Sequence, residues 1–285
     1  MRHHQLLESR SFSTRSVIGS VVAGVMFMFI PLLSLVGVSP ASGSTTSGPK
    51  PTIVLVHGAW ADGSSWNRVL LRLQADGYVV DVPPNPLRGP SEDSAYLSSF
   101  LATISGPIVL VGHSYGGFVI TDAATGNSNV KALVYVDAFI PAAGETLLQL
   151  TAGSCLSGNP GNVFNAVPYA AGVDLYIKGA ASSTFSGFDK CFANGVPGRR
   201  AAALAATQEP IALSALSEPS TSPAWASIPS WSVIGTQDQV IPPASQEMMS
   251  KRADAQITTV PAGHLSLITQ PSAVTHVIEQ AAAAS

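Results

Sequence analysis

From residue 52 onward, the chain alternates short runs of apolar, β-branched residues with segments whose apolar positions follow helical spacing. The strand-like runs lie at 52–58, 79–84, 107–113, 130–137, 230–238 and 255–263. Helical patterns lie at 64–78, 93–105, 243–254 and 271–284, and another begins after Ser114. Continuously apolar strands that alternate with helices are typical of a parallel sheet covered by helices on both faces. The pattern therefore predicts an α/β fold, and ligands in such folds bind at the carboxyl ends of the strands.

The segment 138–229 interrupts this alternation. It contains no strand–helix unit and is rich in alanine, glycine, serine and proline, with scattered aromatic residues. Because it lies between two strands whose ends carry polar residues, we interpret it as a lid over a functional site, with a peripheral insertion as the alternative. The predicted core then comprises residues 52–137 and 230–285, and residues 42–51 form a linker before it.

The N-terminus has the pattern of a targeting segment. Residues 1–16 carry three arginines, an uncharged apolar run follows over residues 17–38, and small residues come next. This order of basic, apolar and small segments is typical of a secretory signal. We therefore predict a signal peptide over residues 1–41 and export of the remainder, either secreted or periplasmic. The apolar run is also long enough to span a bilayer, so an uncleaved membrane anchor is the alternative.

Composition narrows the classes of partner and compartment. Charged residues make up only 11% of the 285-residue chain and the formal net charge is −3, so the basic character expected of a nucleic-acid-binding protein is missing. The two cysteines, Cys155 and Cys191, both lie in the segment 138–229. In an exported protein such a pair predicts a disulfide, and two buried free thiols are the alternative.

The sequence G-H-S-Y-G at residues 112–116 places Ser114 between a predicted strand and a predicted helix. In this context the motif forms a sharp strand-to-helix turn, the nucleophile elbow, and a small residue in an ordinary tight turn is the alternative. Gly112 and Gly116 lack the Cβ atoms that would clash in such a turn. The backbone N–H of Tyr115, at the start of the helix, would point toward a reacting oxygen. We therefore predict that Ser114 is a nucleophile.

A serine nucleophile needs a base that accepts its proton. His264 follows the last predicted strand and is our candidate for that base. His113 adjoins the serine, so its side chain is expected to point away and pack under the turn. His57 belongs to the loop after the first strand, and His276 lies within the C-terminal helical pattern, where it serves the surface or helix packing.

The acid that orients the base is expected at the end of another strand. Asp238 occupies that position, and the chain order Ser114, Asp238, His264 is the order expected of this fold class. Asp137, at the end of an earlier strand, is the competing acid. If Asp238 is the acid, Asp137 becomes a residue of the pocket wall or of the supporting structure.

The loop after the first strand, with the sequence H-G-A-W at residues 57–60, is expected to complete an oxyanion hole. Gly58 lets the chain turn so that the backbone N–H of Ala59 faces the serine, next to that of Tyr115. Trp60 and Trp66 either line a pocket or pack under the loop. The remaining candidates for a substrate pocket are Asp137 and Phe139.

With these residues in place, the chain resembles the α/β-hydrolase superfamily over nearly all of its length after the signal. The motifs V-L-V-H-G-A-W and G-H-S-Y-G-G resemble the small esterases related to plant methyl-salicylate esterases and hydroxynitrile lyases. The resemblance implies a six-stranded, mainly parallel sheet, a mobile cap before the acid-bearing strand, no cofactor or metal, and ester hydrolysis through an acyl-enzyme. Carried over by position, it makes Ser114, Asp238 and His264 the triad.

Two positions favour the esterase side of that group. The lyases typically have threonine after the histidine of the oxyanion loop and lysine after the catalytic histidine, and this chain has Gly58 and Leu265. Without a cation beside His264, a departing cyanide would lack stabilisation. We therefore predict a serine hydrolase of small, apolar carboxylic esters. The alternatives are a lyase or haloperoxidase-like use of the same triad, and a small-molecule-binding protein on a hydrolase scaffold.

Overall fold

A computed structural model describes residues 50–179 and 185–285. The predicted signal peptide, residues 1–41, and all but the end of the predicted linker lie outside these described residues. Among residues 50–179 and 185–285, none of the helices combines the length and the apolar character that crossing a bilayer requires.

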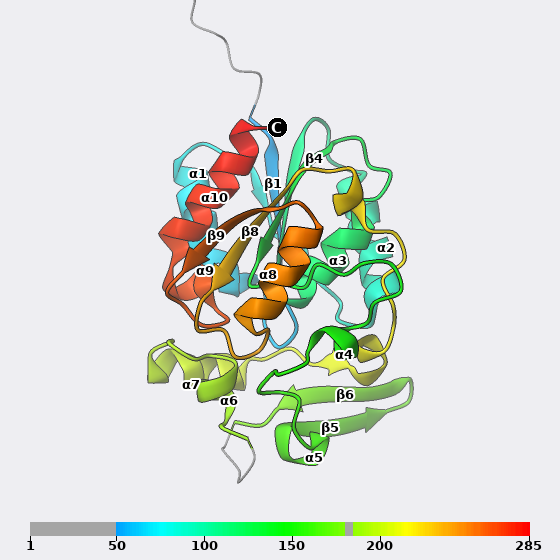
Figure 1. The fold of residues 1–285 in the computed structure, drawn as a ribbon, viewed down its shortest axis with the longest axis vertical. Helices are drawn as coiled ribbons and strands as arrows, with labels where there is room; N and C mark the ends of the chain where they lie inside the picture. The colour runs from blue at the N-terminus through cyan, green and yellow to red at the C-terminus, as the bar shows by residue number, and fades with distance from the viewer. Residues whose placement is uncertain (1–49, 180–184) are drawn as a thin grey trace, which may run out of the picture. The chain divides into compact units, whose positions relative to one another are not determined.

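The centre of the molecule is a six-stranded sheet in which every neighbouring pair of strands is parallel, in the order β2-β1-β3-β4-β8-β9 (Figure 1). The strands are β1 (Thr52–Val56), β2 (Val80–Asp81), β3 (Ile108–His113), β4 (Val130–Val136), β8 (Ser230–Gly235) and β9 (Gln256–Val260). Every residue of β3 and β8 is buried, as expected for strands that are covered on both faces. The structure confirms the predicted fold class.

The second strand is much shorter than the sequence pattern predicts. The pattern extends over residues 79–84, whereas β2 contains only Val80 and Asp81. Pro83 and Pro84 follow after Val82, and a proline has no backbone N–H to donate to a neighbouring strand. The ladder therefore stops before them, at the edge of the sheet.

Helices cover the two faces of the sheet. On one face, α1 (Asn67–Ala75) packs against α10 (Pro271–Ala283), and on the other α2 (Pro90–Leu101) packs against α3 (Tyr115–Ala123) (Figure 1). This part also contains α8 (Pro243–Arg252), which lies along β8 and β9. Short turns of helix, η1 (Gly63–Trp66) and α9 (Ser266–Thr269), precede α1 and α10. Almost every residue of α3 is buried, so the helix that follows Ser114 is held firmly against the sheet.

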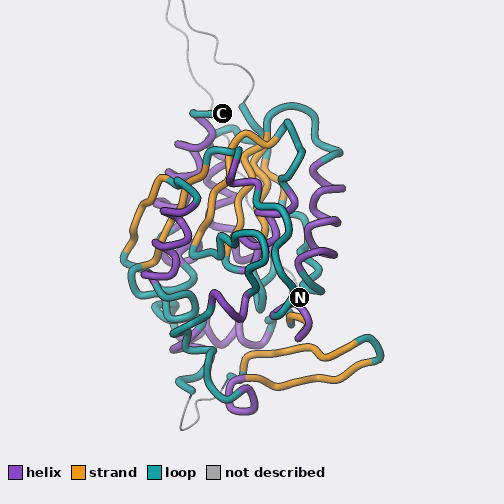
Figure 2. Tube along the Cα trace, turned by 45° about the vertical axis from the view of Figure 1, so that its right-hand side comes forward, coloured by secondary structure: helices purple, strands orange, loops and turns teal. Residues whose placement is uncertain are grey.

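The segment between β4 and β8 forms a second, antiparallel sheet, which the sequence pattern did not reveal. Its strands are β5 (Phe164–Tyr169), β6 (Gly172–Ile177) and β7 (Ile211–Ala212). The hairpin of β5 and β6 projects to one side of the molecule in Figure 2. The short helices of this segment are α4 (Leu147–Leu150), α5 (Pro160–Val163), α6 (Phe188–Cys191), α7 (Gly198–Ala206), η2 (Leu213–Leu216) and η3 (Ala224–Ala226). We call residues 138–229 the inserted segment.

Most of the inserted segment, from α4 to η2, lies beyond the carboxyl ends of the main sheet's strands, whereas η3 lies beside α3 (Figure 1). A disulfide joins Cys155, which follows α4, to Cys191, the last residue of α6, with Cα atoms 5.8 Å apart. Between them lies the β5–β6 hairpin. The disulfide therefore ties together two parts of the inserted segment that approach the same edge of the sheet.

Candidate active site

Three side chains from three different loops meet at the carboxyl edge of the sheet. Ser114 follows β3, Asp238 follows β8 and His264 follows β9. The Ser114 Oγ lies 2.9 Å from His264 Nε2, and His264 Nδ1 lies 2.9 Å from the Asp238 Oδ2. All three side chains are buried. The structure thus brings the predicted nucleophile, base and acid into one hydrogen-bonded chain.

Ser114 has a backbone conformation that few non-glycine residues adopt, with φ 53° and ψ −123°. Strain of this kind costs about 1–3 kcal/mol and persists only where the surroundings enforce it. The surroundings here are extremely close: a Cβ added at Gly112 would lie 2.5 Å from the Gly116 carbonyl oxygen, and one at Gly116 would lie 2.5 Å from the Val56 carbonyl oxygen. The two glycines therefore permit the sharp turn that presents the serine.

Each oxygen of the Asp238 carboxylate accepts two hydrogen bonds. Its Oδ1 accepts from the backbone N–H groups of Val240, 2.8 Å away, and Ile241, 3.0 Å away. Its Oδ2 accepts from the Gln246 side chain, 2.7 Å away, in addition to His264. With the His264 Nδ1–H donating to this carboxylate, His264 Nε2 is free to accept from the serine hydroxyl.

Asp137, the competing acid, is fully buried and points elsewhere. Its Oδ1 accepts from the Gly235 N–H at 2.7 Å and its Oδ2 from the Ser266 N–H at 2.9 Å, so it joins the ends of β4, β8 and α9. Burial, followed by the charge of Asp238, raises the pKa of Asp137 to about 7. It is absent from the residues that line the cavity described below. The expectation of a pocket-wall role for Asp137 is therefore corrected: it is a supporting residue.

The other histidines have structural contacts. His113 donates through Nε2 to the His264 carbonyl oxygen at 2.9 Å, and burial lowers its pKa well below the usual value. His57 accepts at Nε2 from the backbone N–H of Asn85, 3.1 Å away, so its Nδ1–H donates to the Gly58 carbonyl oxygen. Burial lowers the pKa of His57 as well. His276 lies on α10, where its ring contacts the Gln280 side chain.

The loop after β1 approaches Ser114 closely. A Cβ on Gly58 would lie 2.7 Å from the serine Cβ, which explains why the position has no side chain. Ala59 and Tyr115 both line the cavity at Ser114. The N–H of Tyr115 is at the first position of α3 and has no partner within the helix. For the Ala59 N–H, no acceptor occurs among residues 50–179 and 185–285.

The two tryptophans of this loop differ in position. Trp60 lines the cavity. Its indole N–H donates to the Leu175 carbonyl oxygen at 2.8 Å, and its backbone N–H donates to the Glu209 carbonyl oxygen at 2.9 Å. Trp66 is fully buried and meets the His113 ring edge to face. Trp60 therefore lines the pocket, whereas Trp66 packs under the loop.

A cavity of about 1020 Å³ opens above Ser114. Trp60 and Phe139, both predicted pocket residues, line it together with residues of α4, β5, β6, β7 and η2. Within the described part of the chain, no Asp, Glu, Lys or Arg side chain contributes to the lining. A site of this kind favours apolar, uncharged ligands. Within the same residues, no cluster of three His, Cys, Asp or Glu side chains is placed to hold a metal ion.

Several contacts at the site could not be found from the sequence. Gln246 lies eight residues after Asp238, on α8, and Asn85 lies in a proline-rich loop. Asn194 of the inserted segment reaches the loops that carry Asp238 and His264. These are isolated amide side chains outside any motif. Only the proximity of Asn194 to Cys191 in the sequence could have drawn attention to it.

Known proteins match the chain over most of its length. The model of the alpha/beta hydrolase family matches residues 53–277. The carbendazim hydrolyzing esterase of Nocardioides sp. (strain SG-4G) is 34% identical over an alignment of 110 residues. The match covers 34% of this chain and 46% of that protein, so it spans less than half of the relative. The alpha/beta hydrolase nvfD of Aspergillus novofumigatus (strain IBT 16806) is 26% identical over 260 residues, covering 82% of this chain and 97% of that protein.

Solved structures resemble the same region. An extracellular α/β-hydrolase from a Paenibacillus species, described as sharing structural and functional homology with tobacco salicylic acid binding protein 2, covers 81% of this chain and 98% of its own. Its TM-score is 0.63 at 20% sequence identity, a level that shows a common fold. With the family model matching from β1 into α10, the chain belongs to the alpha/beta hydrolase family.

Proposed function

We propose that this protein is a serine esterase that hydrolyses uncharged carboxylic esters with a bulky apolar group. The observation that carries the proposal is the hydrogen-bonded chain Ser114–His264–Asp238 at the floor of an uncharged, largely apolar cavity. A packing serine would need neither a strained backbone nor a histidine whose second nitrogen is held by a buried carboxylate. The esterase named among the relatives supports the same reaction class.

In the proposed reaction, Ser114 Oγ attacks the ester carbonyl carbon while its proton passes to His264 Nε2. Asp238 stabilises the resulting imidazolium, and the N–H groups of Ala59 and Tyr115 hold the negative oxygen of the tetrahedral intermediate. The bond from the carbonyl carbon to the alcohol oxygen then breaks, and the alcohol leaves with the proton from His264. A water molecule, deprotonated by the same nitrogen, attacks the carbonyl carbon of the acyl-serine. The bond from this carbon to Ser114 Oγ then breaks, the carboxylic acid is released, and His264 returns the proton to Oγ.

The cavity supports a larger substrate than the sequence suggested. Its volume of about 1020 Å³ lies at the upper end of what ligand pockets of drug-sized molecules reach, roughly 300–1,000 Å³. Most of its wall comes from the inserted segment, which we propose acts as the cap over the site. A charged acyl or alcohol group would lose its hydration there without gaining a counter-ion.

The test is hydrolysis of a panel of p-nitrophenyl esters with acyl chains from acetate to long and branched chains. We expect turnover by the native protein and none above background for Ser114→Ala. The matched control is Ser94→Ala, which removes the hydroxyl of another buried serine, one that donates to the Val119 carbonyl oxygen. Turnover that survives Ser114→Ala would overturn the nucleophile, and ligand binding without any ester turnover would favour a binding protein.

Export remains part of the proposal. The Cys155–Cys191 disulfide supports an oxidising compartment, since disulfides rarely persist in the cytosol of mesophiles. Mass spectrometry of the mature N-terminus would distinguish a cleaved signal from a retained anchor. A start near residue 42 supports cleavage, and an intact first residue on membrane-bound protein supports the anchor.

A further inference from the structure

We propose that Asn194 is a positioning residue for the Asp238–His264 pair and that the Cys155–Cys191 disulfide holds it in place. This inference rests on the proposed function, because it assigns a role to the inserted segment in the same reaction. The segment would then do more than enclose the substrate: it would keep the acid and the base at their working separation.

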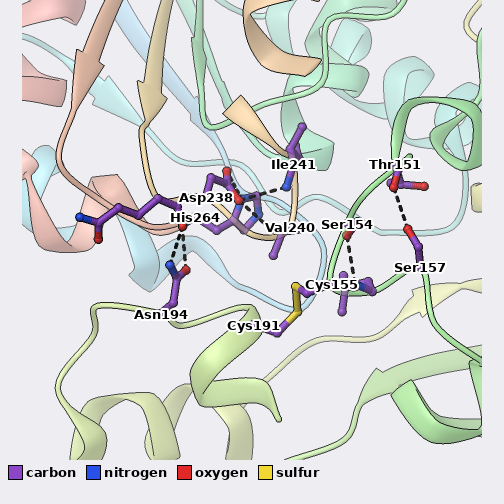
Figure 3. Close-up of a disulfide and its surroundings, with 12 residues drawn as sticks. Thr151, Ser154, Cys155, Ser157, Cys191, Asn194, Asp238, Val240, Ile241 and His264 are labelled. Atoms are coloured by element: carbon purple, nitrogen blue, oxygen red, sulfur yellow. Dashed lines mark hydrogen bonds and ion pairs between the residues drawn. A yellow bond between two sulfur atoms is a disulfide. The ribbon is translucent and has the colours of Figure 1, made fainter. Parts of the chain in front are cut away.

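The Asn194 amide bridges the two loops that carry the acid and the base. Its Nδ2 donates to the Gln237 carbonyl oxygen at 2.7 Å, immediately before Asp238 in the chain. Its Oδ1 accepts from the backbone N–H of His264 at 3.3 Å. Figure 3 shows the side chain pointing from the inserted segment toward this part of the core. One amide group therefore fixes the backbone of both loops relative to each other.

Gly263, the residue before the base, makes room for this bridge. A Cβ on Gly263 would overlap the oxygen, nitrogen and carbon of the Asn194 amide group. The backbone of Gly263 does not have the positive φ that would itself require glycine. The close approach of Asn194 is thus the feature of the structure that a side chain at this position would disrupt.

The disulfide connects the bridge to a second contact on the other side of the acid. Cys191 stands three residues before Asn194, and its partner Cys155 donates its backbone N–H to the Gln239 carbonyl oxygen at 2.8 Å. The carbonyl groups of Gln237 and Gln239, which flank Asp238, therefore accept hydrogen bonds from Asn194 and Cys155, respectively. We call these two contacts, joined through the Cys155–Cys191 disulfide, the clasp around the loop that carries Asp238 (Figure 3).

Phe192 completes the contact on the side of the base. This residue is buried, and its ring lies 5.3 Å from the His264 ring in an edge-on arrangement. The same ring lies 6.1 Å from Trp60 of the loop after β1. The turn that carries Cys191, Phe192 and Asn194 therefore contacts His264 from the side of the inserted segment and helps to keep its ring buried.

Loss of this clasp would change the geometry of proton transfer more than the binding of substrate. Asn194 is absent from the residues that line the cavity, so KM has no direct contribution from it. A shift of the acid relative to the base lowers kcat, and displacements of about 1 Å at an active site cost up to about 100-fold in rate. We expect about a tenfold fall in kcat for Asn194→Ala, with KM within about twofold.

The test compares Asn194→Ala, Gly263→Ala and the double variant in ester hydrolysis and in the rate at which a fluorophosphonate labels Ser114. Both single variants remove the same bridge, one from each side, so the double variant should lose little more than either alone. Asn165→Ala is the matched control, because Asn165 is an exposed residue of β5 in the same segment. The Asn194→Asp variant keeps the acceptor for the His264 N–H but sets a carboxylate oxygen against the Gln237 carbonyl oxygen, so it should lose at least as much rate as Asn194→Ala. Reduction of the disulfide in the native protein should slow labelling by a similar factor.

Each outcome decides between the two proposals. If the native protein neither hydrolyses esters nor is labelled, the proposed function fails and this inference with it. If the native protein is active and Asn194→Ala matches it in kcat and labelling rate, the inference alone fails. Additive losses in the double variant, or an equal loss in Asn165→Ala, also overturn it, because the rate would then not depend on the bridge.

Discussion

The main sheet and the inserted segment contribute to the site in different ways. The sheet supplies the groups proposed to react, because Ser114, Asp238 and His264 all stand in loops at the carboxyl ends of its strands. The inserted segment supplies most of the cavity wall. The sheet strands β3 and β8 are buried throughout, whereas the β5 hairpin strand exposes 47% of Val167 and 42% of Tyr169.

This difference separates a firmly held part of the site from one that can vary. Buried parallel strands leave little freedom for the positions of the loops that follow them, so the groups proposed to react are held by the core. An exposed hairpin tolerates substitution more readily, and the cavity changes with it. The two regions are nevertheless linked on both sides of Ser114, through the Trp60 contacts to Leu175 and Glu209 and through Asn194.

The largest effect is expected from Asp238, one of two buried aspartates of the core. Asp238→Asn should lower kcat by about 10⁴-fold, since an acid-to-amide change in such a triad leaves the histidine in the wrong tautomer. Asp137→Asn should keep kcat within about tenfold, because Asp137 contacts backbone N–H groups and not His264. Steady-state kinetics on one p-nitrophenyl ester measures both. Equal losses would show that both aspartates serve the base.

An intermediate effect is expected from a larger side chain in the cavity wall. Ala212, on β7 of the inserted segment, lines the cavity, and Ala212→Phe should lower kcat/KM for long-chain esters about 10–100-fold relative to acetate. The control is Ala203→Phe, the same change at an exposed position of α7 outside the cavity lining. A similar loss for all chain lengths would mean that the inserted segment does not select the substrate.

The smallest effect concerns stability and belongs to the core alone. The pKa of Asp137 is raised by burial to about 7, above the roughly 3.9 of an unfolded chain. Between these values the folded protein keeps a proton that the unfolded chain has released, so this contribution is fully present below about pH 4 and is lost as the pH rises through about 7. The slope is at most about 1.4 kcal/mol per pH unit.

Urea denaturation of the native protein and of Asp137→Asn between pH 4.5 and pH 8 would measure this contribution. The variant cannot titrate at this position, so its stability should fall less steeply with rising pH over this interval. Parallel pH profiles for the two proteins would show that Asp137 is ionised throughout, with its negative charge stabilised by the hydrogen bonds from the Gly235 and Ser266 N–H groups.

Much of the core was predictable because its signals are local. The apolar runs predicted all six strands of the main sheet, and G-H-S-Y-G between a strand and a helix predicted the turn at Ser114. His264 and Asp238 were selected by their place after strands, since parallel strands bring their carboxyl ends to one edge. Their catalytic roles, like those of Ala59 and Tyr115, stay predictions.

The inserted segment was not predictable in the same way. Its hairpin contains Pro168 and Gly172 and is joined to β7 across a long stretch of chain, so neither periodicity nor a turn motif marks it. The size of the cavity, about 1020 Å³, follows from how these elements are spaced above the sheet. Asn194 contacts Gln237 and His264, which follow it by 43 and 70 positions in the sequence. A lone asparagine carries no signal of such contacts.

By itself, the sequence determined the class of fold and where along it the side chains proposed to react stand, because strand patterns and the serine motif depend on neighbours in the chain. Only the tertiary structure decided which aspartate faces His264, which tryptophan meets the cavity, and what the inserted segment holds. Asp137 and Asp238 both follow buried strands, and their partners differ only because Ser266 and Gly235 face one and His264 the other. Such choices depend on contacts between distant segments, which exist only once the sheet has formed.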